Sequence, residues 1–164
     1  MKSNDVRAQL KAILPTPQGV GIFLSDGHKV IAIFVDPFVA SAITMFARGM
    51  RSARPMTHDL IMSVLAGLNV RIAKVVINDL KEGTFHARLY LRQENELGQS
   101  VVEIDARPSD SIALAIAQKC PVFVKPEVWE KADDMAWALE EARKAIHDQE
   151  NHPEDSLGSE EPPV

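Results

Sequence analysis

The apolar residues in the first part of the chain predict a β-hairpin. They run through residues 20–24 and 29–35, on either side of Ser25-Asp26-Gly27-His28. Asp-Gly is typical of a two-residue type I′ turn, in which both central residues have positive φ. Residues 6–14 fit two patterns, because their apolar positions alternate as in a strand and also recur at helical spacing. We therefore leave that segment open between a strand and a helix.

Further along, apolar positions recur every three to four residues in some segments, which predicts helices, and every two residues in others, which predicts strands. The last helix is expected to begin at Pro126 and to continue as one helix, with Trp129, Ala132, Met135 and Leu139 on one stripe. The predicted elements are helices at 38–48 and 57–68, strands at 70–78, 84–92 and 100–106, a helix at 109–119, a strand at 122–124 and the final helix.

The tripeptide Ala-Arg-Pro occurs twice, each time just before a predicted helix. Arg54-Pro55 is followed by Thr57 and Asp59, and Arg107-Pro108 is followed by Ser109 and Asp110. We interpret both as a helix start with a hydroxyl N-cap and an acidic residue in the first turn. Either an old duplication of a strands-then-helices unit or convergent capping chemistry explains the repeat.

Charge separates the chain into a body and a tail. The net charge is −5, and residues 148–164 hold six acidic residues and no lysine or arginine, so residues 1–147 are close to neutral. The tail has few apolar residues to offset the entropy of ordering it. We predict one folded domain over residues 1–147 and an acidic disordered tail over 148–164.

Two classes of protein are excluded by the sequence. The single cysteine, Cys120, excludes an intrachain disulfide framework. The longest apolar run extends only from Val30 to Val35, whereas a membrane-spanning helix needs about 20 residues. No secretory signal follows Met1. We expect a cytoplasmic protein without a membrane partner.

Two arginines are candidates for phosphate binding. Arg54 and Arg107 precede predicted helix N-termini, where free N–H groups attract anions, and guanidinium binds phosphate with two hydrogen bonds. The alternative is local: Arg54 would pair with Asp59, and Arg107 with Asp110, to brace each helix start. His58 beside Asp59 is a further candidate acid–base pair, although adjacent helical residues point in different directions.

A second set of candidates lies on the predicted strands. His86, Arg88 and Tyr90 share one face of strand 84–92, which suits binding of a nucleic-acid backbone and a stacked base. Glu103 and Asp105 share a face of the following strand, about 7 Å apart, and could hold a divalent cation. The alternative is cross-strand pairing of these acids with the arginines.

Three segments together resemble the bifunctional nuclease domain family. They are Arg54-Pro55-Met56-Thr57-His58-Asp59-Leu60, Asp79-Leu80-Lys81-Glu82-Gly83-Thr84-Phe85-His86-Ala87 and Asp105-Ala106-Arg107-Pro108-Ser109-Asp110-Ser111-Ile112-Ala113-Leu114-Ala115. Their order and spacing match over roughly residues 6–132. The family usually has a glycine and then a glutamate before the first helix, where this chain has Asp36 and Val39.

The resemblance implies an α+β fold with a largely antiparallel sheet flanked by helices, and a hydrolase that degrades RNA and DNA. With the carboxylate pair on strand 100–106, we expect phosphodiester hydrolysis assisted by Mg or Mn. The alternative is a non-catalytic regulatory module that binds an anion or a protein. The motif positions and the strand candidates together give the expected site: catalytic residues His58, Asp59, Asp105 and Asp110, substrate-binding residues Arg54, Thr57, Arg107, Ser109, His86 and Arg88, and metal ligands Glu103, Asp105 and Asp110.

The first predicted helix also suggests self-association. Phe38, Val39, Ala42, Ile43 and Phe46 leave it little polar face before Arg48. A helix that is apolar nearly all round has to be buried on more than one side. We therefore predict a homo-oligomer built on dimers.

Overall fold

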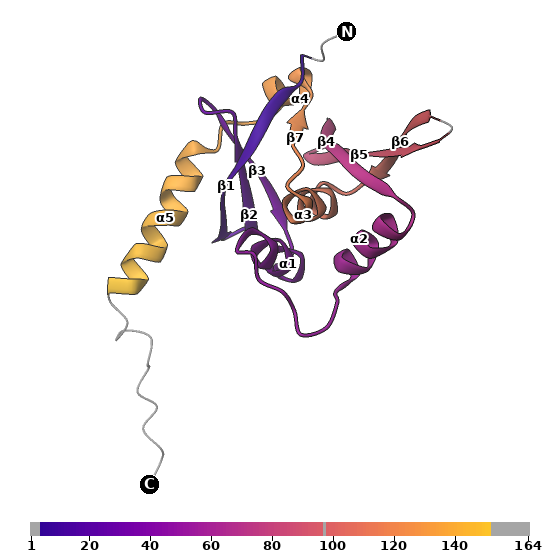
Figure 1. Ribbon diagram of the computed structural model, residues 1–164. Coiled ribbons are helices and arrows are strands. Elements are labelled where there is room, and N and C mark those ends of the chain that lie inside the picture. Colours follow the sequence, from indigo (N-terminus) through magenta and orange to yellow (C-terminus); the bar gives the residue numbers. More distant parts are fainter. Residues whose placement is uncertain (1–3, 97, 152–164) are drawn as a thin grey trace.

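The computed structural model describes residues 4–96 and 98–151, and within them seven strands form a single, mostly antiparallel sheet. The sheet order is β3-β2-β1-β7-β4-β5-β6, and only β4 and β7 are parallel. With the helices, this gives the predicted α+β class (Figure 1). The strands are β1 (Val6–Thr16), β2 (Gly19–Ser25), β3 (Val30–Val35), β4 (Val70–Lys81), β5 (Thr84–Asn95), β6 (Gly98–Ala106) and β7 (Val122–Val124).

The helices cover both faces of the sheet. Ile22, Ile33, Ile43 and Ile112 belong to a core shared by the first strands, α1 and α3, whereas Phe23 packs in a second core beneath α5. No helix within the described residues is long and apolar enough to cross a membrane. The helices are α1 (Pro37–Ala47), α2 (Thr57–Gly67), α3 (Pro108–Gln118), α4 (Pro126–Lys131) and α5 (Ala136–Asn151).

The topology repeats a unit of three antiparallel strands followed by a helix. Strands β1–β3 lead to α1, and β4–β6 lead to α3, and the two helices pack side by side (Figure 1). Both helices have proline in the first turn, with Asp36 and Arg107 as their N-caps. The repeated Ala-Arg-Pro instead relates α2 to α3, so that short sequence match does not follow the structural repeat.

The predicted hydroxyl N-caps were wrong for both helices. Met56 caps α2 and Arg107 caps α3, so Thr57 and Ser109 lie inside the first turns. Proline explains the difference in α3. Pro108 has the fixed φ of a first helical residue and needs no N–H partner there, so the helix begins two residues earlier than a Ser109 cap requires.

The β2–β3 hairpin was predicted correctly, but its turn type was not, and the segment left open between strand and helix is a strand. The ambiguous segment 6–14 lies in β1, which pairs with β2. The β2–β3 hairpin is also present, yet Ser25 pairs with Val30, which leaves a four-residue loop. Gly27 has a φ of 105°, whereas Asp26 is not among the residues with positive φ, so the turn is not type I′. The Asp26 carboxylate instead accepts hydrogen bonds from the N–H groups of His28 and Lys29, both at 2.9 Å, and these lower its pKa.

The predicted final helix is broken into two. Ala132 has extended backbone angles (φ −69°, ψ 141°) and ends α4. The N–H of Met135 then donates to the Val30 carbonyl at 2.7 Å, so the break is held against β3. Trp129 and Leu139 consequently enter different cores. The helix α5 extends to Asn151, past the expected boundary at 147, and residues 152–164 lie outside the described residues.

The apolar residues of α1 are mostly used within the chain. Ala42 and Ile43 are buried, and Val39 and Phe46 pack against the core. Phe38 alone among the predicted interface residues is largely exposed, at 90%. The packing of α1 against α3 therefore removes the reason for which a partner was expected at this helix.

Candidate active site

The start of α3 places an arginine and a carboxylate together. Arg107 caps the helix and Asp110 lies in its first turn. The guanidinium donates to both Asp110 oxygens, from Nε at 2.8 Å and from Nη2 at 3.2 Å. This contact with Asp110 is the main reason that the pKa of Arg107 is raised. The local pairing expected of Arg107 is therefore present.

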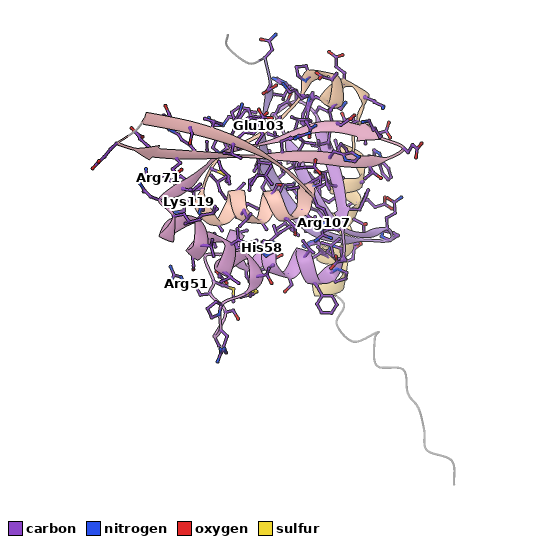
Figure 2. The ribbon with its side chains drawn as sticks, turned by 90° about the vertical axis from the view of Figure 1, so that its right-hand side faces the viewer. Arg51, His58, Arg71, Glu103, Arg107 and Lys119 are labelled. Carbon is purple, nitrogen blue, oxygen red and sulfur yellow. The ribbon has the colours of Figure 1, made fainter. Side chains whose placement is uncertain are left out.

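The same carboxylate contacts a histidine from another helix. His58, in the first turn of α2, has its Nε2 at 3.5 Å from Asp110 Oδ1. The His58 ring also meets the edge of Phe46, with ring centroids 6.0 Å apart. The histidine side chain is only 13% exposed, against 69% for Arg107. Figure 2 shows His58 and Arg107 close together on one face of the molecule, below the β5–β6 hairpin.

The partner of His58 is thus Asp110 rather than its chain neighbour Asp59. The Asp59 Oδ2 accepts a hydrogen bond from the Met56 N–H at 2.8 Å, which closes the first turn of α2. This role explains why an acidic residue follows His58 without forming the predicted pair. The packing of α2 beside α3, which the sequence did not reveal, brings His58 to Asp110.

A cavity of about 370 Å³ opens beside this cluster. Its walls come from β3, the β4–β5 turn and the start of α3. Arg107 and Ser109 line it together with Asp36, whose charge also contributes to raising the pKa of Arg107. Thr57 is exposed at the start of α2 and is not among the lining residues. The cavity therefore contacts one of the two predicted Arg-Pro sites.

Two residues near this cavity occupy the positions where the family pattern differs. Asp36 accepts hydrogen bonds from the N–H groups of Phe38 (2.9 Å) and Val39 (3.1 Å), and so caps α1. Sequence analysis did not assign Asp36 to the site, although Asp-Pro before an apolar run is a helix-start signal. Val39 is half-buried and packs against the core.

Arg54 lies in the exposed segment between α1 and α2. Within residues 4–96 and 98–151, it takes part in no ion pair. The expected Arg54–Asp59 brace is therefore not formed. Joint action of Arg54 and Arg107 at one phosphate remains a prediction.

The candidate site residues on β5 and β6 lie opposite one another in the sheet. Asp105 is opposite Arg88, and Glu103 is opposite Tyr90. Burial and then the Glu103 charge raise the pKa of Tyr90. His86 is exposed near the β4–β5 turn, opposite Asp79. Among the ion pairs of the described residues, neither Glu103 nor Asp105 is joined to an arginine, so the expected cross-strand ion pairs are not formed although Asp105 and Arg88 are in register. Both acids lie on β6, a different element from the His58–Asp110 contact.

The predicted metal ligands do not gather. The described part of the chain contains no group of three or more His, Cys, Asp or Glu side chains that could hold a metal ion. Glu103, Asp105 and Asp110 therefore do not form the expected set. The physical reason is that Asp110 lies on α3 and contacts Arg107 and His58, whereas the other two carboxylates lie on β6.

Comparisons with known proteins agree with the resemblance in the sequence. Residues 22–136 match the bifunctional nuclease domain. An uncharacterized protein of Mycobacterium tuberculosis, present in strains CDC 1551 and H37Rv, is 34% identical over 119 residues, which are 71% of this chain and 68% of that protein. A protein of Oryza sativa subsp. japonica named bifunctional nuclease 2 is 26% identical over 124 residues, 75% of this chain and 37% of the rice protein.

Proposed function

Because the chain belongs to the bifunctional nuclease domain family, we propose that it hydrolyses phosphodiester bonds of RNA and DNA at the His58–Asp110–Arg107 cluster. The observation that supports this most is that one carboxylate, Asp110, contacts both a histidine and an arginine, and that the arginine lines a cavity. The arrangement combines a base and a phosphate-binding cation, which are the groups that the reaction needs.

In this proposal each residue has a distinct role. Asp110 holds the His58 ring through Nε2, which leaves Nδ1 to take a proton from the attacking water. The water oxygen bonds to phosphorus, the ester P–O bond breaks, and the leaving oxygen takes up a proton from solvent. Arg107 faces the cavity and stabilises the negative charge that develops on the phosphoryl oxygens. Asp110 also stabilises the imidazolium that forms on His58.

The divalent cation is a separate proposal. The predicted ligands do not come together, so we derive no step through a metal ion. Chelation of divalent cations tests the requirement directly. If cleavage persists at full rate in excess chelator, the histidine, the arginine and water suffice.

A non-catalytic anion- or protein-binding module is the second candidate. In that candidate the arginines serve binding and the acids are structural, and the two hydrogen bonds from Arg107 to Asp110 agree with a structural role of Asp110 at the start of α3. Turnover separates the two candidates. A purified chain that binds RNA but does not cleave it supports the module.

The test is a digestion assay with RNA, single-stranded DNA and duplex DNA, with Mg, with Mn and with chelator. We expect Asp110→Asn to lower cleavage by about 10²-fold, because it removes the group that orients His58. Asp105→Asn is the matched control, and we expect it to retain activity because its strand partner is Arg88. Equal rates for wild type and Asp110→Asn would instead identify a contaminating nuclease or a different site.

We expect Arg107→Lys to weaken RNA binding by about one to two decades. Lysine keeps the positive charge but cannot make the two parallel hydrogen bonds of a guanidinium group, which costs roughly 1.5–3 kcal/mol of binding free energy. Binding is measured in the His58→Asn background, so that substrate is not consumed, and the thermal midpoint checks the helix brace. Arg54→Lys is the comparison. If Arg54→Lys weakens RNA binding as much as Arg107→Lys does, the two arginines share one anion site. If Arg54→Lys leaves RNA binding unchanged, the site is restricted to Arg107.

A further inference from the structure

The strand β6 is a sheet edge with little cover. It pairs with β5 on one side and has no strand on the other within the described residues (Figure 1). From Gly98 to Asp105, all of its residues are exposed. Three of them are large and apolar: Val101, Val102 and Ile104, at 58%, 53% and 42%. A long, apolar, uncovered edge is a template for pairing with another strand.

A second line of exposed apolar residues lies on α2. Leu60, Val64 and Leu68 are 60%, 51% and 60% exposed and follow one another at intervals of four residues on α2. Their neighbour Leu65 packs in a core with Leu89 of β5. Since Ile104 is the cross-strand partner of Leu89, the α2 line and Ile104 lie on the same side of the β5–β6 hairpin.

From these features we propose that a second copy of the chain pairs with β6, antiparallel and about a two-fold axis at Val102. An isologous interface brings the same edge from both copies, so each supplies the strand that the other lacks. Val102 then lies beside Val102 of the second copy, and Ile104 beside its Ser100. A stable interface buries roughly 1,200–2,000 Å², so the second copy covers the α2 line as well as β6.

Charge favours this register. With the axis at Val102, Glu103 of the second copy lies opposite Val101. Val101 is in turn opposite Arg92 of β5, so the acid and the arginine lie on either side of Val101. No two acidic residues are then directly opposed. A shift of the axis to Ile104 would place Glu103 opposite the second copy's Asp105, and like charges in that position destabilise a strand pair. The proposal concerns assembly and does not depend on catalysis.

Light scattering on the full chain is the first test. We expect the wild type at micromolar concentration to have twice the 18.1 kDa mass of one chain. Val102→Lys places two like charges at the axis, and we expect it to give the mass of one chain with an unchanged circular dichroism spectrum. Phe38→Lys is the control for the α1 surface and should remain dimeric. A monomeric wild type, or a dimer that survives Val102→Lys, overturns the proposal.

Cysteine cross-linking tests the register without relying on a charged variant. In a Cys120→Ala background, Val102→Cys should form an interchain disulfide under mild oxidation, because directly opposed residues have Cα atoms about 4.5–5.5 Å apart. Ile104→Cys should not, since its counterpart lies four residues out of register, about 13 Å along the strand. Efficient cross-linking at Ile104 but not at Val102 would overturn this register.

Discussion

Replacing His58 with asparagine is expected to lower the rate of phosphodiester cleavage by about 10²–10⁴-fold, the usual contribution of a general base. Asparagine fits the half-buried position beside Phe46 but cannot take up a proton at neutral pH. The rate is measured by single-turnover cleavage of a labelled RNA. Circular dichroism and the thermal midpoint verify that α2 still packs against α3.

His28→Asn is the matched control, because this histidine is exposed in the β2–β3 loop on a different part of the chain. The double variant His58→Asn/Asp110→Asn adds a second criterion. If Asp110 acts only by holding His58, the double variant cleaves no more slowly than His58→Asn, since residues that act as a unit are non-additive. If the rate losses of the two single variants multiply in the double variant, this positioning role of Asp110 is contradicted.

Replacing Phe23 with alanine is expected to lower the free energy of unfolding by about 3–5 kcal/mol. Phe23 is fully buried and packs with Ala32 and Leu139, so it joins the β-sheet to α5. Removal of the ring leaves a cavity that the neighbouring side chains cannot fill. Urea denaturation followed by fluorescence measures the change, and the thermal midpoint should fall by roughly 10 °C.

The control for this prediction is the same substitution at an exposed phenylalanine. Phe38 is 90% exposed at the start of α1, so Phe38→Ala should change the free energy of unfolding by no more than about 0.5 kcal/mol. A large loss at Phe38 would mean that a partner covers it in solution, as first expected for α1. A loss below about 1 kcal/mol at Phe23 would show that α5 does not depend on this core.

Local pattern was enough for most of the secondary structure. Alternation over 84–92 identified β5, because one face of that strand differs from the other, and β4 and β6 were also predicted from the residues at 70–78 and 100–106. The errors in the N-cap of α3 and in the β2–β3 turn have local causes, whereas the break in the last helix involves a longer-range contact. After the helix break at Ala132, the Met135 N–H donates to the Val30 carbonyl of β3, and the Ala136 N–H donates to the Asp134 carboxylate at 3.1 Å. The local pattern of apolar residues continues through that break and gave no sign of it.

The sequence by itself determined the α+β class, the family and the identity of the chemical groups: a histidine in one motif, and an arginine and two aspartates in another. It did so because these features depend on residue type and on short spacing. Only the tertiary structure decided which carboxylate His58 contacts. His58 and Asp110 are far apart in the chain, and the packing of α2 beside α3 brings them to 3.5 Å. It also separated Glu103 and Asp105 from Asp110, because β6 ends before α3 begins and the carboxylates lie on different elements.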